Sequence, residues 1–365
     1  MAPSELAIQL AYVVAAAMFI YGLKLLGSAD SARRGNMMSA IAMLLAIVSA
    51  LLDQGIVEYQ WILLGFVIGG ATGGFVARQV KMTAMPEMVA LFNGFGGLAS
   101  LLVGAAALST NPSTFTLVSI VLSILIGGLT FTGSLIAYGK LSETLSSGAV
   151  IFGGQQIVNS FLVLGIFASA TMFCLEPGNM QWLFLVVTLS LLFGVMAVIP
   201  IGGADMPVVI SLLNSYSGLA ACAAGFAINN NILIVAGSLV GASGIILTQI
   251  MCKAMNRSLI NVLVGAIAES GGSQSDADEV YAGRVKSTSA EEVAMLLDGV
   301  RRVVIVPGYG LAVSQAQHQV RDLATLLESQ GVEVEYAIHP VAGRMPGHMN
   351  VLMAEADVEY DKLKE

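Results

Sequence analysis

Long runs of apolar residues recur along the first 255 residues, and short polar segments separate them. A helix that crosses about 30 Å of hydrocarbon needs roughly 20 residues, because each residue adds about 1.5 Å. Nine runs come close to this length, so the pattern predicts nine membrane-spanning helices. We place them near Leu6–Leu26, Met37–Leu52, Trp61–Val80, Met88–Leu108, Phe115–Tyr138, Ile157–Cys174, Trp182–Ile201, Val208–Ile228 and Ile232–Met255.

The hydrophobic pattern changes after Arg257. Residues 258–288 contain the polar run SGGSQSDAD and are interpreted as a linker. The segment Ser289–Glu292 has the spacing of a capping box and predicts a short helix to about Leu297. A continuous apolar strand at 302–307, a helix to about residue 329 and a second strand at 332–338 then predict a βαβ unit. The pattern thus divides the chain into residues 1–257, 258–288 and 289–365.

Composition supports a membrane part followed by a small soluble part. Fifty-six per cent of the residues are hydrophobic, 11% are charged and the mean hydropathy is +0.82, outside the range of soluble domains. Eight Lys or Arg and eight Asp or Glu precede Ser258, whereas eight basic and sixteen acidic residues follow from there. The acidic last third argues against nucleic acid or anionic lipid as its partner.

The basic residues of the membrane part predict its orientation. Cytoplasmic loops carry an excess of Lys and Arg, and here all the basic residues follow odd-numbered spans. They are Lys24, Arg33, Arg34, Arg78, Lys81, Lys140, Lys253 and Arg257. We therefore expect the N-terminus outside and the C-terminal part in the cytoplasm. The start of the chain has no basic segment, so the first run is expected to be a retained helix.

Small residues and cysteines in the spans are interpreted mainly as packing residues. Glycines cluster at 69–74, 94–97 and 237–244, and small residues let membrane helices approach closely. Helix rotation or a water path is the alternative interpretation. Cys174, Cys222 and Cys252 lie in apolar surroundings without metal-ligand spacing, so no metal site is predicted.

Four polar residues within or beside the spans are candidates for function. Asn93, Ser134 and Asn214 lie in the predicted fourth, fifth and eighth spans, where they could bond across helices or line a hydrated path. Asp205 precedes Met206 and Pro207, which is the pattern of a helix N-cap. An N-cap carboxylate can also relay protons, so both interpretations of Asp205 stay open.

The turn between the predicted strand and helix suggests a nucleotide site. Gly308 and Gly310 have the spacing of a dinucleotide-binding turn, although Val313 replaces the third glycine. Other uses of an α/β unit remain the alternative. The second strand ends without a carboxylate to accept from a ribose hydroxyl, which favours NADP over NAD. Arg344, in the loop that follows, is suited to contact a phosphate.

Several longer segments resemble the beta subunit of the proton-translocating NAD(P) transhydrogenase, and the resemblance covers essentially the whole chain. They are Phe131–Lys140, Gly203–Val208, Leu213–Gly218, Ile250–Arg257, Gly308–Gln317 and His339–Val351. The resemblance implies nine spans and a Rossmann-like cytoplasmic NADP(H)-binding domain in a bacterial inner membrane. It also implies an alpha subunit that carries NAD(H), a dimer of alpha–beta units, and hydride transfer coupled to proton movement.

The resemblance also implies the roles of individual residues. Hydride passes between the two cofactors, so no catalytic side chain is expected. Asn93, Ser134, Asp205 and Asn214 would lie on or beside the proton path, although some members carry His at the position of Asn93. The NADP(H) site would comprise Gly308, Tyr309, Gly310, Ala312, Val313, Ala342, Gly343, Arg344, Met345 and Pro346.

The length of the C-terminal part departs from the family pattern. The family's domain continues for roughly a hundred residues more, and we expect the Rossmann-like domain to be incomplete in this sequence. Two other functional classes were weighed. A channel or secondary transporter with a nucleotide-sensing domain would require a filter, broken helices or a buried substrate-binding charge, and none is evident. An inactive membrane scaffold is the third class.

Overall fold

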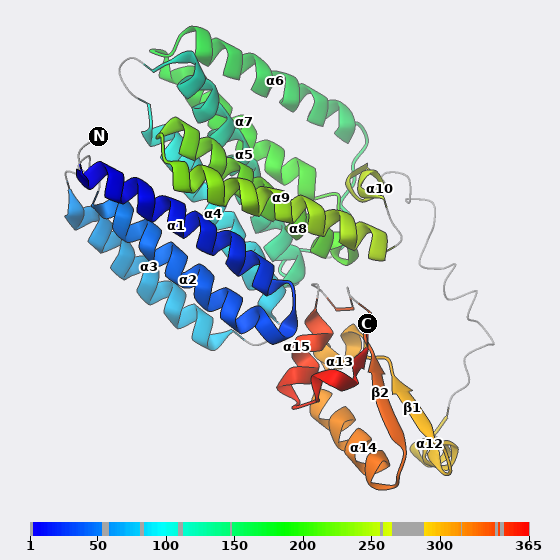
Figure 1. Cartoon of the computed structure of the whole chain (residues 1–365). Helices are drawn as coiled ribbons and strands as arrows, with labels where there is room; N and C mark the ends of the chain where they lie inside the picture. The colour runs from blue at the N-terminus through cyan, green and yellow to red at the C-terminus, as the bar shows by residue number, and fades with distance from the viewer. Residues whose placement is uncertain are drawn as a thin grey trace.

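The computed structural model describes residues 3–52, 58–80, 84–108, 112–146, 148–255, 258–264, 288–314, 316–339, 342–343 and 347–364. Within these ranges nine helices are long and apolar enough to cross a membrane, which confirms the predicted spans. They are α1 (Pro3–Leu26), α2 (Ala29–Leu51), α3 (Tyr59–Gln79), α4 (Met85–Ala106), α5 (Thr114–Leu141), α6 (Gln155–Leu175), α7 (Met180–Val198), α8 (Met206–Ala227) and α9 (Asn231–Ala254). They form one bundle (Figure 1).

The start of α2 is the largest difference from the predicted spans. The helix begins at Ala29 instead of Met37, because its first two turns carry polar residues that hydropathy does not detect. Gly22 of α1 and Gly35 of α2 allow this segment to pack closely against α1. A Cβ on Gly35 would lie 2.7 Å from the carbonyl oxygen of Gly22, so the two backbones approach too closely for any larger residue.

Small residues also decide how the inner helices pack. Between α4 and α5, a Cβ on Gly97 would lie 2.8 Å from the carbonyl oxygen of Gly127. Between α8 and α9, a Cβ on Gly218 would lie 2.7 Å from the carbonyl oxygen of Gly237. The packing interpretation is therefore confirmed for these glycines.

The glycines of α3 behave differently. A Cβ on any of Gly69, Gly70, Gly73 or Gly74 would meet no described atom within 4 Å, and α3 has no buried residue. For the glycines at 69–74, the prediction that they pack tightly is therefore wrong with respect to the described residues of the chain.

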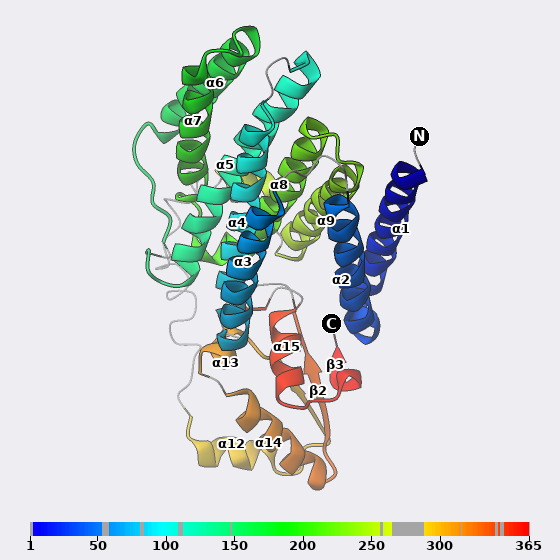
Figure 2. The same cartoon turned by 90° about the vertical axis from the view of Figure 1, so that its left-hand side faces the viewer.

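The C-terminal part contains a small parallel sheet beyond one end of the bundle (Figures 1 and 2). Its strands β1 (Arg302–Ile305), β2 (Glu333–Ala337) and β3 (Leu363–Lys364) lie in that order, with Val303 opposite Val334 and Tyr336 opposite Leu363. The helices are α12 (Ala290–Leu297), α13 (Tyr309–Val313), α14 (Gln317–Ser329) and α15 (His348–Glu355), with a 3-10 turn at Tyr360–Lys362. The predicted order strand, helix, strand is present, but three short strands do not by themselves make a Rossmann fold.

Alternation along the strands decides which sheet face is buried. Val334 and Tyr336 are almost fully buried and pack with Leu327 of α14 and Met349 of α15. Arg302 and Val304 point the other way and are exposed. This period of two is what a half-buried strand requires.

Two predictions for this part need correction. The turn expected at Gly308–Val313 contains a short helix, α13, and the helix expected to follow it up to Ser329 is α14. The linker expected from Ser258 begins with a short helix, α10 (Leu259–Val264). The capping box is confirmed in one half: the Ser289 hydroxyl accepts from the backbone N–H of Glu292 at 3.3 Å.

Candidate functional site

A cluster of three polar side chains joins helices α4, α5 and α8. The amide Nδ2 of Asn93 donates to the Ser134 hydroxyl at 3.0 Å. The Ser217 hydroxyl in turn donates to Asn93 Oδ1 at 2.7 Å. Asn93 is half-buried and Ser134 is buried. The structure thus brings together two predicted residues, Asn93 and Ser134, and adds Ser217, which the sequence analysis missed.

Gly94 of α4 allows the helices that form this cluster to pack closely. A Cβ on Gly94 would lie 3.1 Å from the Cβ of Ser134, so the absence of a side chain at Gly94 lets α5 approach Asn93. Ser217 reaches Asn93 from α8 on the same side of α4. Because three helices supply one group each, the cluster depends on the packing of the bundle and not on any one segment.

Asp205 lies at the N-terminal end of α8, outside the Asn93 cluster. It ends the 3-10 turn Gly203–Asp205 and occupies the N-cap position, with Pro207 in the first turn as predicted. Its side chain, however, makes no capping hydrogen bond to α8. Twelve residues separate Asp205 from Ser217, which corresponds to about 18 Å along the helix. A proton passing from one to the other would need intermediate carriers.

Asn214 also lies apart from the cluster. It is exposed on α8 and makes no side-chain hydrogen bond with the part of the chain that the structure describes. Its neighbour Ser215 faces α9 instead, and donates to the carbonyl of Gly241 at 2.7 Å. The predicted position of Asn214 on the proton path therefore stays a prediction.

Lys140 is a buried cation that the charge pattern had assigned to a cytoplasmic loop. Only 1% of its surface is exposed. Its Nζ donates to the carbonyl oxygens of Gly148, Ile199 and Ile201 at 2.9, 2.6 and 2.7 Å. The last carbonyls of a helix lack partners within it, and Lys140 supplies a donor for those that end α7. It thereby fixes the segment that leads to Asp205.

The glycine turn follows β1 directly, at the carboxyl edge of the sheet. Gly308 precedes α13 with φ −123°, an extended conformation that any residue can adopt. The backbone conformation of Gly308 therefore does not require a glycine. A Cβ on Gly308 or Gly310 would meet no atom of the described residues within 4 Å. The space beside both glycines is open to a ligand.

His348 connects the glycine turn with the loop after β2. Its ring centroid lies 6.3 Å from that of Tyr309. Gly343 has φ +99°, and a Cβ there would collide with the His348 ring. His348 is 1% exposed. Two predicted cofactor segments, which contain Tyr309 and Gly343, are thus adjacent at the carboxyl ends of neighbouring parallel strands, where α/β sheets bind ligands.

The remaining predicted cofactor residues divide into two groups. Ala312 is fully buried in the core of the C-terminal part, and Ala342 packs against that core. They therefore support the fold around the open glycines. Arg344, Met345 and Pro346, together with the side chain of Val313, lie outside the described residues.

Ion pairs stabilise the sheet away from this edge. Arg302 donates through Nε to Glu335 at 3.1 Å, and this hydrogen bond lowers the pKa of the Glu335 carboxyl. Lys362 Nζ lies 2.6 Å from Glu328 Oε1, which raises the pKa of Lys362. Burial raises the pKa of Tyr336, with the Glu328 charge adding to it. None of these four charged groups belongs to the open space beside the glycines.

Comparison with known proteins assigns the family. A sequence model described as NAD(P) transhydrogenase beta subunit matches residues 8–365. The NAD(P) transhydrogenase subunit beta of Rhodospirillum rubrum is 45% identical over 366 residues, covering 97% of this chain and 78% of the relative. Its counterpart from a named strain of that bacterium has the same values. The chain therefore belongs to the family of NAD(P) transhydrogenase beta subunits.

Proposed function

We propose that this chain, with an alpha subunit, couples hydride transfer between NAD(H) and NADP(H) to proton movement across a bacterial inner membrane. The observation that carries the proposal is that His348 contacts both predicted cofactor segments, the one with Tyr309 and the one with Gly343. The same chain also has membrane-spanning helices with a polar cluster. Family membership supports the coupling. NAD(H) on the partner and NADP(H) on this chain supply the hydride chemistry.

The residues around the glycine turn fit a phosphate-bearing ligand. Gly308 and Gly310 leave open space beside the backbone, which a pyrophosphate needs for close approach. The loop that begins at Ala342 lies beside this space, and we propose that Arg344 contacts a phosphate there. The three parallel strands would then be part of a Rossmann-type NADP(H) domain.

The polar cluster in the bundle fits proton movement. Asn93, Ser134 and Ser217 donate and accept hydrogen bonds without carrying charge, so they can hold water without the cost of a buried ion. We propose that the cluster lines the proton path in the bundle. Asp205 would exchange protons where the bundle ends, and Asn214 would lie beside the path.

We propose the orientation predicted from the basic residues, with the C-terminal part in the cytoplasm. Lys24, Arg78, Lys140 and Lys253 lie in the last turns of α1, α3, α5 and α9. Four of the five odd-numbered helices thus end on a basic residue, α7 being the exception, as expected where these ends face the cytoplasm. Assembly as a dimer of alpha–beta units belongs to the same proposal.

The test of the cofactor site is Gly310→Ala, in the chain co-expressed with its alpha subunit. Gly310 lies inside helix α13, and a Cβ there would meet no atom of the described residues, so alanine should stabilise the fold slightly. A methyl group in the open space should nevertheless weaken NADPH binding at least tenfold, measured by NADPH fluorescence. Gly178→Ala, at another open glycine far from the sheet, is the control. Wild-type NADPH affinity in Gly310→Ala would overturn the proposed site.

A further inference from the structure

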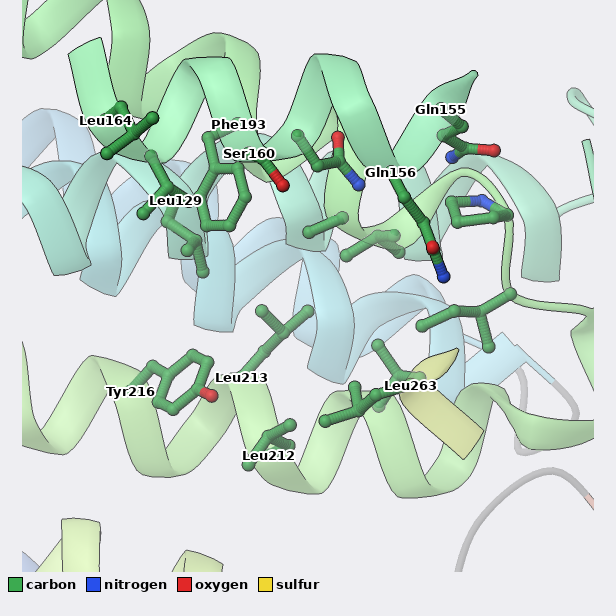
Figure 3. A pocket seen from close by; sticks show the side chains of 17 residues that line it. Leu129, Gln155, Gln156, Ser160, Leu164, Phe193, Leu212, Leu213, Tyr216 and Leu263 are labelled. Carbon is green, nitrogen blue, oxygen red and sulfur yellow. The ribbon is translucent and has the colours of Figure 1, made fainter. Parts of the chain in front are cut away.

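Two pockets in the bundle differ in the charge of the side chains that line them. The first, of about 760 Å³, lies between α6 and α8 (Figure 3), and no Lys, Arg, Asp or Glu is among the described residues that line it. The second, of about 270 Å³, is formed by α2 alone. This α2 pocket is lined by Arg33, Arg34, Met37, Met38 and Ile41. Of the two, the α2 pocket is therefore the one whose walls indicate the charge of an occupant.

The helical period places the two arginines at the end of an apolar face. Side chains four residues apart lie on the same side of a helix. Met37 follows Arg33 by four residues, and Ile41 follows Met37 by four. Arg34 and Met38 form a second row beside the first. All five side chains are exposed or half-buried, so the α2 pocket opens on the outer surface of the bundle.

The arginines lie at headgroup depth, and the apolar face below them matches one leaflet. They fall in the first turn of the candidate span Ser31–Leu51, where a spanning helix enters the membrane. From Met37, which is 62% exposed, exposed apolar side chains continue to Val48, which is 44% exposed. The rise from Met37 to Val48 is about 16 Å, roughly half of the hydrocarbon thickness. An acyl chain of one leaflet can therefore lie along this face, directly beneath two cations.

The arginines are not neutralised by the described part of the chain. No salt bridge joins Arg33 or Arg34 to a described carboxylate. From Lys24 to Arg34 the sequence has three basic residues and one acidic residue, Asp30, a formal charge of +2. Arg33 and Arg34 are also the only adjacent basic residues in the first 257 positions. Two neighbouring guanidiniums repel each other, and a phosphate between them would accept hydrogen bonds from both.

We propose that the α2 pocket binds one anionic phospholipid, of the phosphatidylglycerol type. Its phosphate would accept hydrogen bonds from Arg33 and Arg34, as basic pockets on spanning helices bind anionic headgroups. One acyl chain would lie along the apolar face from Met37 to Val48. A zwitterionic headgroup would bring its own cation close to the guanidiniums, so phosphatidylethanolamine and phosphatidylcholine should bind less well. This site does not depend on the proposed function.

The experiment uses the full chain co-purified with its alpha subunit. The detergent contains equal amounts of phosphatidylglycerol, phosphatidylethanolamine and phosphatidylcholine with identical acyl chains, and native mass spectrometry counts each retained lipid. The wild type should retain one more phosphatidylglycerol per chain than Arg33→Gln/Arg34→Gln, and equal numbers of the other two lipids. Arg33→Lys/Arg34→Lys keeps the charge and should keep part of this difference. Arg78→Gln removes an exposed arginine from α3 and, as the control, should retain the lipid.

A further pair of variants tests the location without changing charge. Met38→Trp fills the α2 pocket and should remove the same phosphatidylglycerol. Met43→Trp, at an exposed methionine of α2 that does not line the pocket, is the matched control and should retain it. If the glutamine variant does not assemble, the lysine variant and Met38→Trp decide the outcome.

Three results would overturn the proposal. The first is a wild type that retains no more phosphatidylglycerol than the glutamine variant or Met38→Trp, as when water or acidic residues of the C-terminal part occupy the arginines. The second is an additional lipid that is zwitterionic. The third is an equal loss in Arg78→Gln or Met43→Trp, which would mean that the lipid is attracted by the general charge or surface of the bundle.

Discussion

Replacing Asp205 with asparagine separates the two interpretations of this residue. The side chain keeps its size and its ability to accept hydrogen bonds, but it loses its charge and its capacity to titrate. Asp205 occupies the N-cap position of α8 without a side-chain capping bond. The usual loss of 0.5–2 kcal/mol on removing a cap, an approximate figure from other helices, therefore does not apply here.

The expected cost in stability comes from the loss of the negative charge at the N-terminus of α8. A carboxylate at a helix N-terminus gains about 0.3–1 kcal/mol from the helix dipole, so Asp205→Asn should lose about that much through the dipole, while its amide oxygen can still accept hydrogen bonds. A positioned acid–base group contributes about 100-fold to 10,000-fold in rate. If Asp205 relays protons, the loss in coupled turnover should therefore be about 100-fold or more, far beyond the effect on stability.

The assay uses vesicles that contain the chain with its alpha subunit. Absorbance of an NAD analogue reports hydride transfer from NADPH, and an internal dye reports pH. We expect Asp205→Asn to retain wild-type expression and unfolding temperature within a few degrees, while proton uptake and hydride transfer fall together or become uncoupled. Wild-type coupling in this variant would refute the relay. Asp205 would then be an N-terminal anchor for α8, and the proton path would lie elsewhere.

Three further predictions concern the bundle and the sheet. In a double-mutant cycle, Asn93→Ala and Ser217→Ala should couple by about 0.6 kcal/mol in unfolding free energy; additive effects would mean that their 2.7 Å hydrogen bond contributes nothing. Lys140→Met removes the Nζ donor from three carbonyls, of which Ile199 keeps the N–H of Val150, and should lower stability by about 1–3 kcal/mol, checked by thermal unfolding in detergent. The lowered pKa of Glu335 contributes stability that is present above its ordinary value of 4.5 and is lost as the pH falls through the folded pKa. The protection of β1 and β2 amides, corrected for intrinsic exchange at each pH, should accordingly fall below pH 4.5 in wild type and less steeply in Glu335→Gln; identical profiles would show that the pair with Arg302 is unimportant.

The sequence alone determined the elements of this protein, because hydropathy and turn chemistry are local. Nine apolar runs corresponded to nine helices, and the strand before Gly308 and the strand before His339 were both present. The long motifs also identified the family, which the comparisons show. Local signals were weakest where a polar segment continued a helix, as at the start of α2, and where the expected glycine turn contained the short helix α13.

Only the tertiary structure decided which side chains meet. The motif Leu213–Gly218 contains Asn214, Ser215 and Ser217, and hydropathy cannot tell which of them faces α4. The packing of α8 against α4 turns Ser217 toward Asn93 and leaves Asn214 exposed. The same reason explains Lys140, whose charge alone suggested a loop, although carbonyls from the end of α7 bury it. Contacts between distant segments depend on how closely backbones approach, and that is a property of the assembled bundle.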